Sequence, residues 1–280
     1  MTHTQSKNKE MKRYFRMLAL LLIPVVALIL GAAAPELWAG NHDDDDDDEE
    51  IPFDEAEIFF ELNNTDGDLG IHAKIDGEGW KRLRIEDPRE RKMLDIRVKG
   101  RLRKQGLTEL FFESAEPTFD ELDPEDFFNR FPEGEYEIEG ITLDGEELES
   151  EVMLTHVMPA PPEPTVNGVP AAEDCDVDPL PAVSAPVTIA WDPVTMSHDE
   201  IGESGVPLVG DHAVVNYEVV VEIDETPWVT STILPHTATS FEIPQEILAL
   251  VGSGDEIKFE VLVREASYNQ TAVESCFEIE

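Results

Sequence analysis

In the stretch "DEIKFEVLVREA", Asp255 to Ala266, bulky apolar side chains recur at every second position, at Phe259, Val261 and Val263. Because side chains alternate between the two faces of a strand, these three residues share one face. A period of two in aromatic and β-branched residues predicts a half-buried β-strand. The same half of the chain contains four more segments of strand character, which are "PVTIAWDPV", "VVNYEVVVEI", "TSFEIP" and "AVESCFEIE".

The order of these strands resembles that of a fibronectin type III domain, over roughly Pro161 to Glu280. The resemblance implies that Trp191 lies in the second strand against the core and that Tyr217 opens the third strand. The sequence departs from the compact form of that family in a long, exposed loop from Thr195 to Ala213.

Residues 53–158 contain seven short segments of strand character, each bounded by Gly, Asp, Asn or Pro. Seven strands in about a hundred residues predict an immunoglobulin-like β-sandwich. The segment "PEGEYEI" resembles the tyrosine corner of immunoglobulin-like domains, with Glu133, Gly134 and Tyr136 in the corresponding places. We therefore expect an all-β protein with two tandem sandwiches of the immunoglobulin-like and fibronectin type III-like kind.

Three local signals refine the first sandwich. "DGEG", Asp76 to Gly79, predicts a turn between two separate strands. "MLDIRVKGRLR", Met93 to Arg103, has the character of one continuous strand. Asp123 suits the N-cap of a short helix that has Pro124 at its first position.

The N-terminus predicts export. Positive residues from Lys7 to Arg16 precede an apolar run from Met17 to Ala34, which is the layout of a secretory signal. Cleavage is expected after Ala39, and an uncleaved membrane anchor is the alternative. In both cases the chain after residue 40 is exported, so a secreted, cell-surface or periplasmic location is expected.

These observations divide the chain into four parts. They are a signal peptide at 1–39, a disordered acidic run at 40–52, an immunoglobulin-like sandwich at 53–158 and a fibronectin type III-like domain with a Pro-rich lead-in at 159–280.

The charge is strongly negative, with 20 Lys and Arg against 62 Asp and Glu and a formal net charge of −42. Such a chain repels nucleic acid and anionic lipid, so no nucleic-acid partner and no membrane contact beyond the signal segment are expected. Cations and basic proteins are attracted instead.

The chain has two cysteines, Cys175 and Cys276. In an exported protein, a pair of cysteines predicts one disulfide, and two free thiols are the alternative. In a fibronectin type III sandwich the first and last strands run parallel and end at the same pole, so the resemblance implies that the two cysteines can meet.

The few positive charges gather between Lys74 and Lys104. If "MLDIRVKGRLR" is a strand, Arg97, Lys99, Arg101 and Arg103 share one of its faces. Three explanations are open. The face pairs with the acidic last strands of the same sandwich, it holds the N-terminal acidic run, or it binds an external anionic partner.

Two loops carry possible metal ligands. "NNTDGDLG" places oxygen-bearing side chains at Asn64, Asp66 and Asp68, which makes Ca²⁺ the candidate cofactor, with a plain Asp-Gly turn as the alternative. The long loop of the second half offers a weaker transition-metal set, which is His198, Asp199, Asp211 and His212.

No catalytic motif is present, since the sequence lacks His-Glu-x-x-His, a phosphate loop and a dinucleotide fingerprint. We therefore expect a non-enzymatic, extracellular or cell-surface interaction module, Ca²⁺-assisted, with a protein or glycan partner. The alternative is an accessory or catalytic protein that acts on extracellular polysaccharide.

Overall fold

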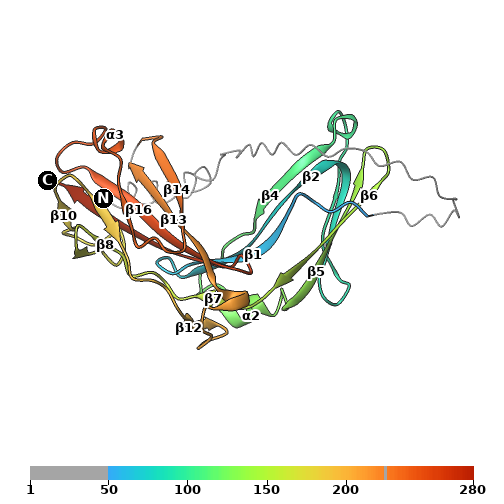
Figure 1. Cartoon of the computed structure of the whole chain (residues 1–280), viewed down its shortest axis with the longest axis horizontal. Coiled ribbons are helices and arrows are strands. Elements are labelled where there is room, and N and C mark those ends of the chain that lie inside the picture. Colours follow the sequence, from blue (N-terminus) through green and yellow to red (C-terminus); the bar gives the residue numbers. More distant parts are fainter. Residues whose placement is uncertain (1–49, 224–225) are drawn as a thin grey trace, which may run out of the picture. The chain divides into compact units, whose positions relative to one another are not determined.

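The computed structural model describes residues 50–223 and 226–280, which are nearly all β (Figure 1). The predicted signal segment at 1–39 and most of the predicted acidic run at 40–52 lie outside the described residues.

Within residues 50–223 and 226–280, no helix combines the length and the apolar character needed to cross a membrane.

The elements of the N-terminal half are β1 (Glu55–Asn63), β2 (Asp68–Glu86), β3 (Lys92–Arg97), η1 (Leu102–Lys104), β4 (Leu107–Glu113), α2 (Pro124–Phe128), β5 (Gly134–Thr142), β6 (Glu147–Leu154) and β7 (Val157–Pro159). Those that follow are β8 (Thr165–Val166), β9 (Val169–Pro170), β10 (Ala182–Val183), β11 (Thr188–Ala190), β12 (Ser197–Gly202), η2 (Gly210–His212), β13 (Val214–Ile223), β14 (Val229–Pro235), β15 (Ser240–Glu242), α3 (Gln245–Leu248), β16 (Glu256–Glu265) and β17 (Gln270–Ile279).

The C-terminal half has the predicted fibronectin type III-like architecture. One sheet has the order β15-β11-β8-β9, and the other contains β14-β13-β16-β17, with β10 parallel to the end of β17. Phe259, Val261 and Val263 are fully buried between the sheets, as their alternation predicts. Trp191 directly follows β11 and packs against Tyr217 of β13, with ring centroids 5.3 Å apart.

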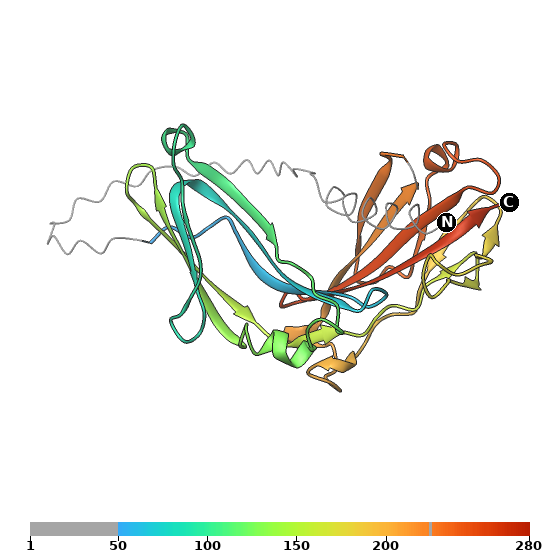
Figure 2. The same cartoon turned by 180° about the vertical axis from the view of Figure 1, so that it is seen from behind.

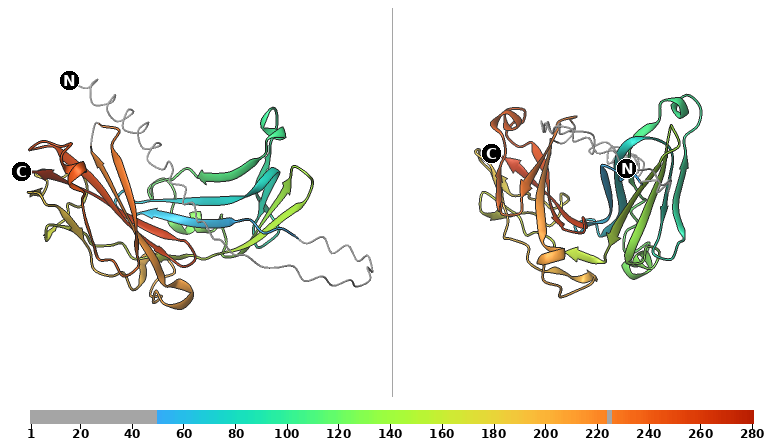
Figure 3. Two further views of the ribbon diagram at one scale, coloured as in Figure 1. Left: turned by 45° about the horizontal axis from the view of Figure 1, so that its top comes forward. Right: turned by 45° about the vertical axis from the view of Figure 1, so that its right-hand side comes forward.

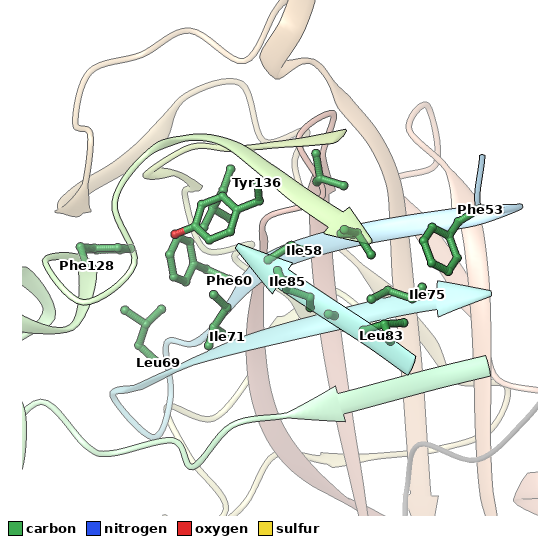
Figure 4. Packing of buried hydrophobic residues seen from close by; sticks show 14 of the residues in the cluster. Phe53, Ile58, Phe60, Leu69, Ile71, Ile75, Leu83, Ile85, Phe128 and Tyr136 are labelled. Carbon is green, nitrogen blue, oxygen red and sulfur yellow. The ribbon is translucent and has the colours of Figure 1, made fainter. Parts of the chain in front are cut away.

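The N-terminal half is a second β-structure with its own buried cluster (Figure 4). The predicted turn at "DGEG" is wrong, because Asp76–Gly79 lie inside the 19-residue strand β2. The first part of β2 pairs with β1 and β4, and its last part pairs with β3 and β5. Glycine tolerates the bend between these parts, and a Cβ on Gly77 would lie 3.1 Å from the Phe53 ring.

The predicted tyrosine corner is present. The fully buried Tyr136 of β5 donates a hydrogen bond from its hydroxyl to the carbonyl of Pro132, over 3.0 Å. Figure 4 shows its ring beside Phe60 in the core. The short helix is also confirmed, because Asp123 accepts a hydrogen bond from the amide of Glu125 at the start of α2.

A parallel pairing joins the two halves. β1 pairs with β17 from Glu61–Gln270 to Asn63–Ala272, so one sheet runs through β16, β17, β1 and β2 (Figures 1 and 2). The division at 158/159 stays a prediction, although buried apolar residues do form one cluster from Phe53 to Met158 and another from Val166 to Phe277.

Asn269, in the turn before β17, holds this joint. Its side chain is fully buried. The amide oxygen accepts a hydrogen bond from the backbone of Phe60 at 2.8 Å, and the amide nitrogen donates to the carbonyls of Thr155 at 2.9 Å and Val157 at 3.1 Å. One side chain thereby satisfies three backbone groups of the other half.

The loop predicted to be exposed, from Thr195 to Ala213, is partly ordered against the N-terminal half. Its strand β12 pairs with β7, and Ile201 packs onto the first cluster. His198 is only 7% exposed, because its Nε2 donates to Asn64 Oδ1 at 3.1 Å while its Nδ1 accepts two backbone amides. The loop is exposed at most of its positions, and the expectation of exposure was wrong at His198, since a histidine with partners for both ring nitrogens can be buried.

Cys175 and Cys276 form the predicted disulfide. Cys276 lies within β17, and Cys175 lies in the segment between β9 and β10. The parallel pairing of β10 with β17 brings the start of the sandwich to the end of the chain, as the resemblance implies.

Replacing Asn269 by Ala should lower the free energy of unfolding by about 3 kcal/mol, because it leaves buried backbone groups of Phe60 and Val157 without partners. Urea unfolding measures the loss. Asn129→Ala, at an exposed helix end, is the control and should change stability by less than about 0.5 kcal/mol. Equal effects of the two substitutions would show that Asn269 does not hold the joint.

Reduction of the disulfide should also destabilise the chain. The bridge closes a segment with a sequence separation of 101 residues. The loop-entropy model gives up to about 4 to 5 kcal/mol for a loop of that length, and measured values often fall below it. Thermal unfolding with and without reductant measures the effect, and a Cys175→Ser/Cys276→Ser double variant should not respond to reductant.

Candidate functional sites

The predicted calcium loop is a tight hairpin connection between β1 and β2. The side-chain oxygen of Asn63 accepts hydrogen bonds from the amides of Thr65 and Asp66, each at 3.1 Å. The amide oxygen of Asn64 faces His198. The loop geometry is thus built by Asn63, a residue outside the predicted set, and Ca²⁺ binding at Asn64, Asp66 and Asp68 stays a prediction.

The predicted basic strand face is not present as such. β3 ends at Arg97, and the chain then turns through Gly100 into the 3-10 helix η1, so the strand prediction was wrong beyond Arg97. The exposed Lys99, Arg101 and Arg103 lie at this connection between β3 and β4, and anion binding there stays a prediction.

Ion pairs within the N-terminal half engage several of the other bases of this region. Arg84 of β2 lies opposite Glu139 of β5 and hydrogen bonds to it, as the explanation by cross-strand pairs with the acidic strands requires. On β3, Asp95 Oδ2 forms ion pairs with Lys92 Nζ at 2.8 Å and with Arg82 Nη2 at 3.5 Å. Much of the positive charge is therefore part of the sheet surface.

The weak transition-metal set of the long loop is not assembled. His198 faces Asn64, whereas His212 Nδ1 lies 3.5 Å from Glu265 Oε2 in the C-terminal half. Asp199 is almost fully exposed beside His198. His212 and Asp211 instead line an open groove of about 520 Å³ together with Met153 and Tyr268.

The structure assembles a histidine cluster that the sequence did not indicate. We use this name for Glu61 of β1, His72 of β2 and Glu116, which follows β4. His72 is 1% exposed, and its Nε2 lies 3.1 Å from Glu116 Oε1 while its Nδ1 lies 4.0 Å from Glu61 Oε2. One ligand atom from each residue lies within 4.8 Å of the other two.

The register of four strands positions this cluster. Glu61 lies between Gly70 of β2 and Gln270 of β17, and His72 lies between Phe59 of β1 and Glu113 of β4. Residues two apart on β2 share one face, so Gly70 and His72 both lie beneath Glu116. The ring of Phe59 packs against the imidazole, with centroids 5.3 Å apart.

Burial and opposite charges compete at the cluster. Burial alone would lower the pKa of His72, but the hydrogen bond to Glu116 and the charge of Glu61 outweigh it and raise the pKa. Burial raises the pKa of Glu61, against the effects of His72 and Gln270. Burial together with the charge of Glu116 raises the pKa of Glu113.

A second acidic group lies on the same sheet, around Lys258 of β16. Its ammonium lies 2.7 Å from Glu274 Oε2, 3.6 Å from Glu260 Oε1 and 3.9 Å from Glu222 Oε2. Burial lowers the pKa of Lys258, but these three carboxylates outweigh it and the pKa is raised. One cation does not neutralise three acids, and burial raises the pKa of Glu260 to about 7.

The end of this sheet exposes an uncharged edge strand. β14 has the sequence "VTSTILP" and, among the described strands, pairs only with β13. Ile233 is 69% exposed, Val229 is 42% exposed, and the preceding Trp228 is 55% exposed. We call these three residues and β14 the edge surface. It has no charged side chain although 29% of the whole chain is charged.

Replacing Glu260 by Gln should remove one source of pH dependence. A carboxyl whose pKa is raised in the folded chain holds its proton there after the unfolded chain has lost it, so stability falls as pH rises from about 4.5 to about 7. The difference in melting temperature, Glu260→Gln minus wild type, should therefore increase from about pH 5 to about pH 8. Glu242→Gln, at an exposed position of β15, is the control. A constant difference across this range would contradict the assignment.

Among known proteins, solved structures match this chain, but no sequence family does. No protein-family model matches the chain, and no curated protein matches it. The FN1-FN3 domains of chicken CNTN1 match with 8% identity and a TM-score of 0.31, over 82% of this chain and 65% of that chain. A two-domain fibronectin type III segment of chicken tenascin matches with 9% identity and a TM-score of 0.29, over 81% of this chain and 98% of that chain.

A tetra-tandem repeat from the extending region of a large adhesion protein matches with 10% identity and a TM-score of 0.26, over 81% of this chain and 50% of that chain. The chain thus spans less than two thirds of the length of this structure and of the CNTN1 structure. These similarities are too low to carry an argument about function. The tandem immunoglobulin-like and fibronectin type III-like fold stands on the strand order and on the buried Trp191, Tyr217 and Tyr136.

Proposed function

We propose that this protein is a non-enzymatic, exported interaction module whose edge surface binds an extended segment of another protein. The observation that carries the proposal is the uncharged strand β14, which presents Val229 and Ile233 to solvent at the end of a sheet. An exposed sheet edge offers backbone hydrogen bonds to an added strand, and its side chains select the sequence of that strand.

The character of β14 supports binding over a merely tolerated edge. Natural edge strands are normally protected by charged side chains, bulges or coverage, because an apolar edge promotes association. β14 is regular along its pairing with β13 and carries no charge, and its one protective residue is Pro235 at the last position. A regular, uncharged and exposed edge strand in such a highly charged chain is typical of a surface that binds a partner.

Charge indicates the chemistry of the partner. On β13, Glu218 lies opposite Ile233 and Glu222 lies opposite Val229. The whole chain carries a formal net charge of −42. A segment that alternates apolar and basic residues would complement both the exposed side chains and the acidic surroundings.

Export and Ca²⁺ belong to the same proposal. Export is supported by the positive and apolar segments before Ala39, and the strongly acidic composition opposes nucleic-acid partners. Ca²⁺ assistance would use Asn64, Asp66 and Asp68, at a cost, because Asn64 would have to give up its contact with His198.

Selection from a displayed library of random peptides tests the edge surface. We expect the enriched peptides to be extended, with alternating apolar and basic residues. Their affinity should fall by roughly tenfold or more for Ile233→Lys, which places a charge at the centre of the edge.

Leu102→Lys is the matched control, since it makes the same change at a position that is 53% exposed and lies in η1, away from β14 in the chain. It should leave peptide affinity unchanged. Peptides that bind Ile233→Lys as well as the wild type, or a library that yields no enriched peptide, would refute the proposed binding surface.

A further inference from the structure

The histidine cluster has the composition of a metal site. Two carboxylates and one imidazole supply the ligand types that divalent transition metals accept in proteins, and the imidazole disfavours Ca²⁺ and Mg²⁺. The side chain of His72 is 1% exposed, whereas Glu61 is 19% and Glu116 is 28% exposed, so the histidine forms the floor and the carboxylates form the rim.

The cluster is wider than a closed site, because Glu116 lies at Nε2 of His72 and Glu61 at Nδ1, so metal binding requires the carboxylates to move toward one ring nitrogen. The three ligand atoms lie within 4.8 Å of one another. Tetrahedral Zn²⁺ with bonds of about 2.0 to 2.1 Å needs ligand atoms separated by about 3.3 Å. Glu116 lies in the irregular segment after β4, where side-chain and backbone adjustment is cheap, while Glu61 and His72 are held in paired strands.

Gly70 shows that space for the cluster is built into β2. A Cβ on this residue would lie 2.5 Å from Glu116 Oε1, 2.8 Å from Glu116 Cγ and 3.1 Å from His72 Nε2. A strand interior is an unfavourable place for glycine, and here its absent side chain lets Glu116 fold across the sheet to the imidazole. This observation is independent of the charges of the three residues.

An outer layer of contacts orients the first carboxylate. Gln270 of β17 donates its side-chain amide to Glu61 Oε2. Arg264 of β16 donates from Nε to Gln270 Oε1 at 3.1 Å, and its guanidinium stacks 4.5 Å from the centroid of Phe59. Metal ligands in proteins are usually held by such second contacts, which come here from the other half of the chain.

We propose that Glu61, His72 and Glu116 bind one divalent transition-metal ion, for which Zn²⁺ is the probe. One ring nitrogen of His72 and one oxygen from each glutamate are the protein ligands, and water completes the coordination. All three ligands belong to the N-terminal half, and the hydrogen bond from Gln270 to Glu61 connects the site to β17, the neighbour of β1 in the sheet (Figure 3).

Calorimetric titration of the full chain with ZnCl₂ tests the proposal. We expect one saturable site that raises the melting temperature. Glu116→Gln keeps a hydrogen-bonding partner for His72 but removes an anionic ligand, and it should weaken Zn²⁺ binding by roughly 100-fold. Glu109→Gln, at an exposed position of β4, is the matched control and should bind Zn²⁺ as the wild type does.

Two further variants separate the site from general attraction to an acidic protein. Gly70→Ala should displace the flexible end of Glu116 and weaken binding by roughly tenfold, and Gln270→Ala should weaken it by roughly 10- to 100-fold. X-ray absorption on the Zn²⁺-loaded wild type should show an imidazole ligand that is absent in His72→Gln.

Three outcomes would overturn the proposal. The first is the absence of a saturable Zn²⁺ site in the wild type. The second is equal Zn²⁺ affinity in the wild type and Glu116→Gln, which would assign the heat to other acids. The third is displacement of Zn²⁺ by an equal concentration of Ca²⁺, which would show that no imidazole takes part.

Discussion

The parallel pairing of β1 with β17 is the constraint on which the rest of the described structure depends. It turns two β-structures, each with its own buried cluster, into neighbours within a single sheet. The buried amide of Asn269 fixes the position of this pairing. Its side chain hydrogen bonds to backbone groups of Phe60, Thr155 and Val157, which would otherwise lack partners. Since a slip of one residue would reverse every side chain of β1, the pairing also fixes which residues face solvent.

That register creates the histidine cluster. Gln270 contacts Glu61 because β17 lies beside β1. Glu61 lies near His72 because the pairing of β1 with β2 places Glu61 opposite Gly70, two residues before His72 on the same face of β2. The outer contacts of Arg264 and Gln270 then come from the fibronectin type III-like half, while the three ligands come from the other half. The joint and the proposed metal site therefore depend on the same pairing of β1 with β17.

The acidic side chains are accommodated differently in the two halves of the chain. In the N-terminal half, bases on β2 and β3 lie beside acids of β3 and β5, and these pairs remain partly exposed, where each contributes little to stability. Around Lys258 of β16, the carboxylates of Glu222, Glu260 and Glu274 share one ammonium, and burial raises the pKa of Glu260 to about 7. The uncharged β14 ends the same sheet.

The sequence by itself determined the features that depend on neighbours in the chain. Alternation identified the core strand around Phe259, Val261 and Val263, the tyrosine-corner segment indicated Tyr136, and the presence of only two cysteines indicated their pairing. These signals have a period of two residues or a span of a few residues, so they are readable before any strand order is known.

Only the tertiary structure decided the rest. "DGEG" has the composition of a turn, but pairing with different strands on its two sides kept β2 continuous through a bend. His198 looked like a solvated loop residue, and contact with Asn64 buried it. Glu61, His72 and Glu116 carried no sequence signal, because their proximity arises from strand register between distant segments, which alternation along the chain cannot specify.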